Sequence, residues 1–351
     1  MTSRDPRIAC LVKVALAAVG WCLAFTAVAE PDNAEAGSGE GDDSQAALEE
    51  LIPADGFEVP EEQLQRLRKY LPNAMAKLEA RQALHMIALG DSVTRYVSRD
   101  ESDGDTHRSY EGVFAAELAK LFFYTGGVRD LRPRGDLPAK STPSAGPEIT
   151  IENMGLGGRL SIHALARLTT DAFVNEPSIM TVSYGINDST ISLNLGTYLS
   201  SFERAAKLAR ENNCDPIFLA PTTILDRGTE LASHASTRPY ANALAALAAK
   251  LGVYYFDLGE ITSKAPGIEP GLSDEAALSA YNEYRAKHYH THADGSIDTL
   301  HPSEEAHKAL GLALYSDLLH GSAAAKYRVG GFVTLDGDGG LELRYKLKNL
   351  T

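Results

Sequence analysis

Five short apolar segments that alternate with helical stretches constrain the fold of this chain most strongly. Each apolar segment has the length of a buried strand, and amphipathic stretches lie between them. Strands that alternate with helices pair in parallel through right-handed crossovers, and the helices cover both faces of the sheet. The sequence therefore predicts one α/β domain around a five-stranded parallel sheet, with strands at residues 86–89, 148–153, 178–184, 216–220 and 253–258.

Helices are predicted where apolar residues recur three and four positions apart. Residues 64–71 have this spacing, and Pro72 is expected to separate this helix from a second helical stretch that ends at Gln82. Four prolines between Arg129 and Pro147 predict a loop instead. Further helices are predicted over residues 113–122, 160–168, 195–209, 240–251 and 302–319.

The N-terminal 29 residues have the pattern of a secretory signal. Arg4 and Arg7 precede an apolar run that ends in the small-x-small sequence Ala27-Val-Ala29. We expect export to the periplasm or the extracellular space, with no stable membrane insertion after cleavage; a retained anchor over residues 8–29 is the alternative. The predicted organisation is a signal peptide (1–29), an acidic disordered linker (30–59), an α/β domain with an N-terminal helical extension (60–320) and a C-terminal β-hairpin extension (321–351).

The formal net charge of −14 restricts the classes of partner. No cluster of Lys and Arg is available to neutralise a phosphate backbone, which argues against a nucleic-acid partner. The overall charge favours a neutral or cationic partner instead. Cys214 is the one cysteine outside the predicted signal, so an intramolecular disulfide is excluded after cleavage, and we expect this side chain to be buried.

The candidate catalytic residues lie in four loops. Ser92 follows the first strand within Gly-Asp-Ser, a triplet that is also ordinary turn chemistry. Because the carboxyl ends of parallel strands meet at one edge of a sheet, we expect the four loops to converge there. The other three are Asn153-Met-Gly155-Leu-Gly157-Gly158-Arg159 after the second strand, Gly185-Ile-Asn187-Asp188 after the third, and Asp298-Thr-Leu-His301-Pro302 before the last helix.

Together, these loops contain the groups that acyl transfer requires. A serine hydroxyl is a weak nucleophile until a neighbouring base accepts its proton. Asp298 can hold one ring nitrogen of His301 while the other nitrogen faces Ser92. The backbone N–H groups of Ser92 and Gly158 and the side-chain amide of Asn187 are the candidate donors to an oxyanion.

In this order, the four loops resemble the SGNH hydrolases, also called the GDSL esterase and lipase family. The resemblance rests on the motifs Gly-Asp-Ser, Asn-x-Gly-x-x-Gly, Gly-x-Asn-Asp and Asp-x-x-His, and it covers residues 84–320. It implies a flavodoxin-like three-layer α/β/α sandwich, a Ser-His-Asp triad and no metal or organic cofactor. Family activities include carbohydrate acetyl esterases, lipases, thioesterases, arylesterases and acyltransferases. Tyr96 departs from the first motif, because glycine is common at that position.

Several other residues have two interpretations. His288, His290 and His292 alternate in the long segment 264–297, either as ligands of a metal ion or as exposed loop residues beside a substrate cleft, and no carboxylate or cysteine set completes a metal site. Arg159 is either a substrate contact or a structural residue. His307 is expected at the surface. The glycine-rich second loop lacks the Gly-x-Gly-x-x-Gly spacing of dinucleotide sites.

The sequence thus predicts an exported serine esterase that hydrolyses short-chain acyl esters, in particular acetyl esters, of a carbohydrate or a similar alcohol. Its substrate is a small-molecule or polysaccharide ester. The alternatives within catalysis are a lipase, a thioesterase or an O-acyltransferase that uses the same triad. A noncatalytic carbohydrate-binding protein of the same fold is the alternative from another class, although the intact motifs argue against it.

Overall fold

The structure of the protein is a computed structural model that describes residues 59–96, 108–131, 146–222, 224–225, 232–233, 237–262, 287, 289–291 and 295–321. The predicted signal peptide, the predicted linker up to residue 58 and the predicted hairpin beyond Gly321 lie outside the described residues. His288 and His292 also lie outside them, and only the backbone of His290 is described.

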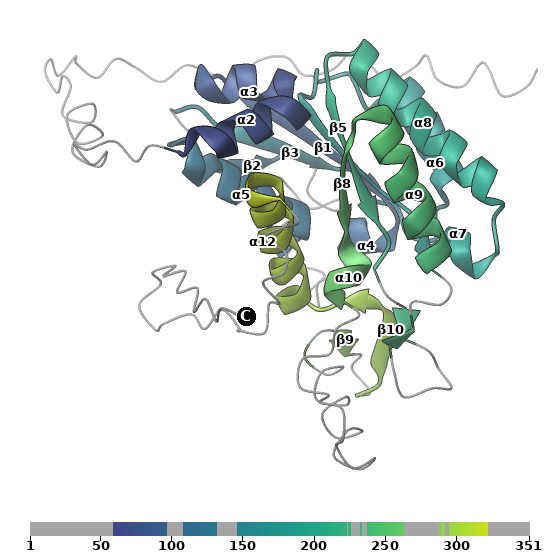
Figure 1. Cartoon of the computed structure of the whole chain (residues 1–351). Coiled ribbons are helices and arrows are strands. Elements are labelled where there is room, and N and C mark those ends of the chain that lie inside the picture. Colours follow the sequence, from purple (N-terminus) through teal and green to yellow (C-terminus); the bar gives the residue numbers. More distant parts are fainter. Residues whose placement is uncertain are drawn as a thin grey trace, which may run out of the picture. The chain divides into compact units, whose positions relative to one another are not determined.

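Six parallel strands form the central sheet in the order β2-β3-β1-β4-β5-β8 (Figure 1). Without the edge strand β2, the other five have the order 2-1-3-4-5 that is typical of flavodoxin-like folds. The predicted α/β class is confirmed, with six strands in the sheet instead of five. The strands are β1 (Leu84–Gly90), β2 (Val128–Asp130), β3 (Ile149–Asn153), β4 (Ile179–Ser183), β5 (Asp215–Ala220) and β8 (Tyr254–Asp257).

The edge strand β2 corrects the prediction of a loop over residues 129–147. Val128, Arg129 and Asp130 pair in parallel with β3. Two of these three residues are charged and only Asp130 is buried, so no apolar run indicates a strand. Strand β2 joins the sheet at its edge through backbone pairing with β3.

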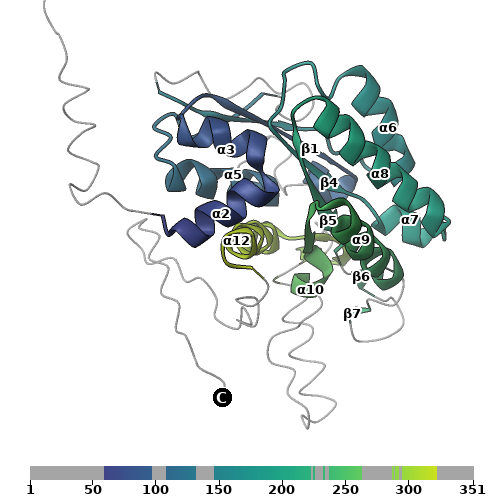
Figure 2. The ribbon, with the colours of Figure 1, turned by 45° about the horizontal axis from the view of Figure 1, so that its top comes forward.

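Helices cover both faces of the sheet (Figures 1 and 2). Successive strand residues point to opposite faces, so Met86 belongs to one hydrophobic core and its neighbour Ile87 to the other. The first core packs against α2, α3, α5 and α12, and the second packs against α6, α8 and α9. These helices are α2 (Glu61–Tyr70), α3 (Pro72–Glu79), α5 (Tyr110–Leu121), α6 (Ser161–Thr170), α8 (Leu195–Glu211), α9 (Arg238–Leu251) and α12 (Glu304–His320).

The first two helices are an integral part of the fold. Pro72 separates them, as expected, and occupies the first turn of α3. The carboxylate of Asp215, at the start of β5, accepts hydrogen bonds from Asn73 Nδ2 at 2.7 Å and from the backbone N–H of Ala74 at 2.8 Å. This carboxylate therefore satisfies the N-terminal end of α3 and ties it to the sheet.

Other helix ends follow the sequence signals closely. Gly252 ends α9 with φ of 62°, a left-handed conformation in which glycine avoids the steric cost of a side chain. The last helix begins two residues later than predicted, because Ser303 is its N-cap and Pro302 ends a strand. The remaining short elements are α4 (Ser92–Arg95), α7 (Ile186–Thr190), α10 (Leu258–Thr262), and the antiparallel pairs β6 (Ile224–Leu225) with β7 (Ala232–Ser233) and β9 (Tyr289–Thr291) with β10 (Ile297–Pro302).

Strand β1 lies between β3 and β4, and the strand order reverses at this point. The segments that follow these three strands carry Ser92, Gly158 and Asn187, so three of the four predicted loops leave the same edge of the sheet. This edge is where open α/β sheets place their ligands. Among the described residues, no helix has the length and apolar character needed to cross a membrane.

Candidate active site

Ser92 is the first residue of the one-turn helix α4, directly after β1. Asp91 caps this helix, because its side chain accepts a hydrogen bond from the backbone N–H of Val93 at 3.0 Å. Gly90 is required by close packing: a Cβ at this position would lie 1.9 Å from Thr94 Oγ1 and 2.8 Å from the carbonyl oxygen of Ser183. The turn therefore holds the partly exposed Ser92 in a defined position at the end of the sheet.

The loop after β3 packs directly against this turn. Asn153 Nδ2 donates to the carbonyl oxygen of Thr94 at 2.7 Å, and Asn153 Oδ1 accepts from the N–H of Gly155 at 2.9 Å. A Cβ on Gly155 would lie only 2.3 Å from the backbone nitrogen of Arg95, so backbone meets backbone here. A Cβ on Gly157 would lie 3.9 Å from Ser92 Cβ, which places this loop beside the serine.

Gly158 and Asn187 lie on neighbouring loops that are bonded to each other. Gly158 is exposed and has φ of +69°, which glycine adopts without strain. The side-chain amide of Asn187 donates from Nδ2 to the carbonyl oxygen of Arg159 at 3.0 Å. An amide nitrogen carries two N–H groups, so this bond leaves the second one available to a ligand.

Asp188 links the same two loops through hydrogen bonds to Ser161. Its buried carboxylate accepts hydrogen bonds from the backbone N–H of Ser161 at 3.0 Å and from Ser161 Oγ at 2.6 Å. Burial raises the pKa of Asp188 above its usual value, although the hydrogen bonds from Ser161 oppose that shift. The residue thus caps α6 and braces the loop that holds Gly158 and Arg159.

His301 and Asp298 form a hydrogen-bonded pair within β10. His301 Nδ1 lies 2.7 Å from Asp298 Oδ2, and Asp298 Oδ1 accepts from the backbone N–H groups of Leu300 at 2.7 Å and His301 at 3.2 Å. Burial of Asp298 would raise its pKa, but the hydrogen bonds from His301 and Leu300 outweigh it and hold the pKa well below its usual value. Asp298 therefore stays ionised and orients the imidazole.

A register shift between Ile297 and Pro302 separates Asp298 and His301 from regular pairing with β9. Such bulges redirect side chains. Strand β10 contacts α4, and the charges of His301 and Asp91 act on each other, so the imidazole lies at the serine edge of the sheet. His301 Nε2 is buried and makes no hydrogen bond, so no bond to Ser92 is formed in this arrangement. Catalytic hydrogen bonds often form only once substrate is bound.

His307 is buried, and the expectation of a surface position is wrong. Its ring stacks on Tyr110 with centroids 5.6 Å apart and meets the ring of Tyr96 edge-on at 4.8 Å. Burial lowers the pKa of His307 to about 3, and the charge of His301 adds to this shift. Tyr96 has φ of 53°, a conformation that favours glycine, and its ring is buried against His307.

Asp91 and Arg95 are two residues of this site whose roles the sequence did not reveal. Burial raises the pKa of Asp91 to about 7, and the nearby Asp188 adds to the shift. Arg95 is exposed at the end of α4 and lies beside Gly157. Both residues lie in the same turn as Ser92. Their closeness to Ser92 in the sequence was the one feature that could have indicated a role in this site.

The prediction for Cys214 agrees with the structure, because this side chain is buried. Burial raises the pKa of its thiol well above the usual value, which keeps it protonated and unreactive. Within the described ranges, no group of three or more His, Cys, Asp or Glu residues is placed to hold a metal ion.

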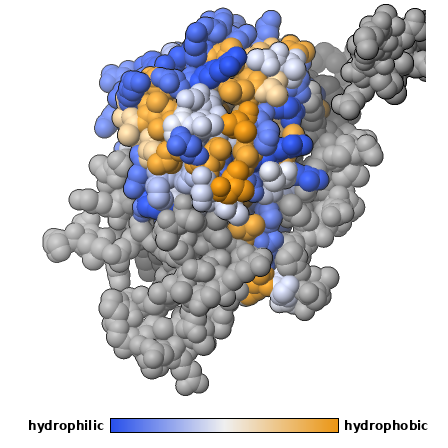
Figure 3. All heavy atoms as spheres, turned by 90° about the vertical axis from the view of Figure 1, so that its right-hand side faces the viewer, coloured by the Kyte–Doolittle hydropathy of each residue, from blue (hydrophilic) through white to orange (hydrophobic). Residues whose placement is uncertain are grey.

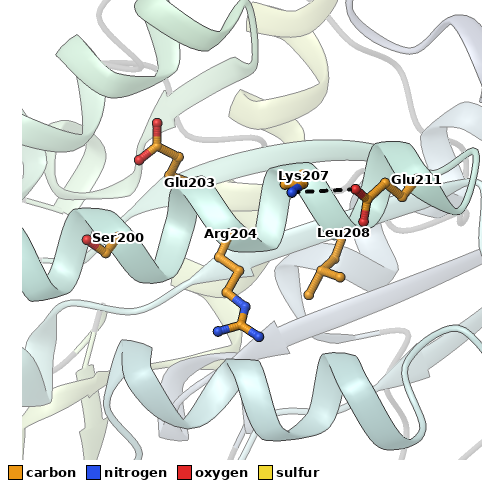
Figure 4. Close-up of a pocket in the computed structure, with 6 residues that line it drawn as sticks. All are labelled: Ser200, Glu203, Arg204, Lys207, Leu208 and Glu211. Carbon is orange, nitrogen blue, oxygen red and sulfur yellow. Dashed lines mark ion pairs between the residues drawn. The ribbon is translucent and has the colours of Figure 1, made fainter.

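A hollow of about 520 Å³ lies along α8, away from this edge of the sheet (Figure 4). Its described lining residues include one serine and no histidine, and its Lys207 and Glu211 form an ion pair at 3.8 Å. A serine without a base is no nucleophile. The hollow is therefore no second candidate for acyl transfer; its lining is Ser200, Glu203, Arg204, Lys207, Leu208 and Glu211.

Exposed aliphatic side chains border the two loops that hold Gly158 and Asn187. Large exposed apolar residues are few in the described part of the chain, and four of the five lie in or next to these loops. The side of the molecule shown in Figure 3 mixes apolar with strongly hydrophilic residues. The four side chains are Leu156, Ile162, Ile191 and Leu195.

Comparisons with known proteins agree with this architecture. The sequence pattern of the GDSL-like Lipase/Acylhydrolase family matches residues 88–309. No curated protein matches the chain. Among solved structures, an acetyl xylan esterase is 14% identical, with 66% of this chain and 98% of that chain covered and a TM-score of 0.43.

An acetylxylan esterase from Geobacillus stearothermophilus, solved as a catalytic mutant, is 15% identical, with 68% of this chain and 94% of that chain covered and a TM-score of 0.45. Likeness at this level does not identify a substrate. The family match, in contrast, covers well over half of the chain and includes all four motifs. The chain therefore belongs to the GDSL-like lipase/acylhydrolase family and is a serine hydrolase that acts on ester bonds.

Proposed function

We propose that Ser92 is the nucleophile of this esterase, His301 its general base and Asp298 the residue that orients the base. One observation carries the proposal. Asp298 holds His301 Nδ1 at 2.7 Å, while the opposite ring nitrogen, Nε2, is buried without a hydrogen bond on a strand that contacts α4. An imidazole whose Nδ1 donates to a carboxylate has a free lone pair on Nε2, which is the acceptor that a serine proton requires.

The chemistry then proceeds in two steps. Ser92 Oγ forms a bond to the carbonyl carbon of the ester as its proton passes to His301 Nε2, and the tetrahedral oxyanion accepts hydrogen bonds from the N–H groups of Ser92 and Gly158 and from Asn187 Nδ2. The bond to the alcohol oxygen breaks, and His301 returns the proton to the departing alcohol. Water repeats the sequence on the acyl-enzyme, which releases the carboxylic acid and restores Ser92.

We further propose that the acyl group is short, in particular acetyl, and that the alcohol is a carbohydrate. The family includes carbohydrate acetyl esterases, and the predicted signal sequence over residues 1–29 would deliver the enzyme to the periplasm or the extracellular space, where polysaccharides are found. In this proposal the acidic segment 30–59 is a tether, residues 60–320 are the catalytic domain, and residues 321–351 are an accessory hairpin. The substrate is a small-molecule or polysaccharide ester.

The decisive experiment measures hydrolysis of 4-nitrophenyl acetate, butyrate and laurate by the wild type and by Ser92→Ala. We expect Ser92→Ala to lose at least about 10³-fold in kcat, because no other group replaces the nucleophile. The matched control is Ser200→Ala, an exposed serine on α8, which should keep wild-type activity. Equal activity of wild type and Ser92→Ala would overturn the mechanism.

The same substrates test the acyl group. A kcat/KM that falls from acetate to laurate supports a short-chain esterase, whereas a rise would favour a lipase and contradict the proposed acyl length. Addition of xylooligosaccharide as acceptor tests the third alternative, since transfer of acetyl to sugar faster than to water identifies an acyltransferase. Release of acetate from acetylated xylan, measured against deacetylated xylan, tests the carbohydrate part.

A further inference from the structure

Most arginines in the described part of the chain have a partner, but two that flank Ser92 have none. Ion pairs, carbonyl oxygens or an aromatic ring engage eight of the eleven described arginines. The side chains of Arg95, Arg159 and Arg204 make no hydrogen bond or ion pair with any residue. Arg204 lies on the exposed face of α8 (Figure 4). The other two belong to the loops of the candidate active site.

Arg95 is the last residue of α4, the helix that begins with Ser92. The position that a Cβ would take on Gly157 lies 3.7 Å from Arg95 Nη1 and 3.9 Å from Ser92 Cβ. The guanidinium group and the proposed nucleophile thus border the same small space above Gly157. Because Gly157 has no side chain, nothing from that residue separates the cation from the serine.

Arg159 belongs to the same loop as Gly157 and directly follows Gly158. Its carbonyl oxygen accepts the hydrogen bond from Asn187 Nδ2 at 3.0 Å, which fixes its backbone beside the proposed oxyanion donors. Its side chain is exposed, and its charge acts on Tyr184 at the carboxyl end of β4. Arg159 therefore presents a cation at the sheet edge where Ser92 and Asn187 lie.

The acidic side chains near these arginines do not neutralise them. Asp91 and Asp188 are buried, and burial raises the pKa of both carboxyls. Asp298 is hydrogen-bonded to His301. In a chain with 47 acidic and 33 basic residues, two unpaired guanidinium groups around one serine are a local reversal of charge. Guanidinium groups match the two oxygens of a carboxylate or phosphate through parallel N–H donors.

We propose that Arg95 and Arg159 form a subsite for a negatively charged oxyacid group of the ester substrate, a carboxylate or a phosphate close to the scissile ester. The proposal rests on the assignment of Ser92 as nucleophile only for the position of the reacting ester. It also revises the expectation of a neutral or cationic partner, because the charge at the site differs in sign from the charge of the whole chain. On a carbohydrate, a uronic acid or a phosphorylated sugar carries such a group.

Three acetyl esters that differ in charge test this subsite: 3-acetoxybenzoate, its neutral methyl ester and 3-acetoxyphenyl phosphate. We expect the wild type to have a higher kcat/KM for at least one anion than for the neutral ester, and the preferred anion distinguishes a carboxylate subsite from a phosphate subsite. Arg95→Gln and Arg159→Gln should each lower the ratio of anionic to neutral kcat/KM by roughly two- to fivefold, the size expected for exposed charge pairs. Arg159→Lys should retain part of the preference.

Arg204→Gln is the matched control, since it removes an equally exposed and unpaired arginine away from Ser92, and it should leave the ratio unchanged. A wild type that does not prefer either anion would overturn the proposal, as would Arg95→Gln and Arg159→Gln variants that keep the wild-type ratio. Calorimetric binding of 3-acetamidobenzoate to Ser92→Ala separates this proposal from the mechanism. If Ser92→Ala remains active, the proposed mechanism fails. Loss of binding in Ser92→Ala/Arg95→Gln and Ser92→Ala/Arg159→Gln would still support the subsite. Unchanged binding in these double variants would contradict it.

Discussion

The turn that carries Ser92 and the strand that carries His301 are positioned by different kinds of contact. Around Ser92, main chain packs on main chain: a Cβ on Gly90 or Gly155 would approach neighbouring backbone to 2.8 Å or 2.3 Å. His301, in contrast, lies on β10, which pairs with β9 outside the parallel sheet. Among the described residues, its imidazole is hydrogen-bonded to one side chain, that of Asp298. Activity should therefore depend on steric room in the first region and on one charged hydrogen bond in the second.

The largest expected effect is a loss of kcat when the charge of Asp298, in the second region, is removed. Asp298→Asn keeps the shape of the side chain but favours the wrong imidazole tautomer, and we expect kcat on 4-nitrophenyl acetate to fall by about 10⁴-fold. The main fold should persist, as checked by circular dichroism. Asp257→Asn is the control, because it breaks the ion pair of Asp257 with Arg238 at 2.6 Å without touching the proposed triad. An Asp298→Asn variant with more than a tenth of wild-type activity would contradict the proposed role of Asp298 in orienting His301.

A steric pair tests the first region. Gly155→Ala forces a Cβ to within 2.3 Å of the backbone nitrogen of Arg95, whereas Gly157→Ala in the same loop meets only ordinary contacts at 3.7 and 3.9 Å. We expect Gly155→Ala to lower the free energy of unfolding by about 3 kcal/mol, at the upper end of overpacking costs, and Gly157→Ala to change it far less. Urea denaturation measures both values. Equal stability of the two variants would show that the loop yields easily.

A smaller effect concerns His307, which joins the two regions through its ring contacts. Its pKa is lowered to about 3 in the folded protein, so the unfolded chain binds a proton more readily as pH falls below about 6.5. The stability that neutral His307 contributes is therefore present above pH 6.5 and is lost as pH falls towards 3. His307→Phe removes this titration, and we expect the loss of unfolding free energy between pH 7 and pH 5 to shrink by roughly 2 kcal/mol.

Thermal unfolding of wild type and His307→Phe across this pH range measures the difference in slope, which does not depend on how well phenylalanine fits. His320→Phe, at the end of α12, is the control and should keep the wild-type slope. Parallel pH profiles for wild type and His307→Phe would mean that His307 does not limit acid stability.

Much of the fold could be predicted from the sequence because its signals are repeated. Strands β1, β4 and β5 are buried along their whole length and contain short apolar runs that the sequence shows. Pro72 and Gly252 mark helix ends through their own backbone geometry, which a local sequence pattern reveals. Strand β2 could not be found because Val128 is the one apolar residue among its three, so no apolar run marks it. The helices α4 and α7 are too short, at four and five residues, to show a helical period.

The candidate site shows where such reasoning stops. Asn187 meets Arg159 and Asp188 meets Ser161 across 28 and 27 residues, and no local pattern encodes these contacts. His307 did have a signal, because Leu310, Leu314 and Leu318 continue its position along the buried face of α12. The roles of Ser92, His301 and Asp298 stay predictions, while the family and the fold are confirmed.

Among the described strands, β10 pairs with β9 and not with the parallel sheet, so the histidine of the proposed triad belongs to a segment outside that sheet. Replacements in the paired strands β9 and β10 can therefore accumulate during evolution without a change in the register of the parallel sheet or the turn at Ser92. The same separation makes this stretch a natural point for recombination between homologous enzymes. A chimaera that exchanges β9 and β10 would inherit Ser92 from one parent and His301 from the other.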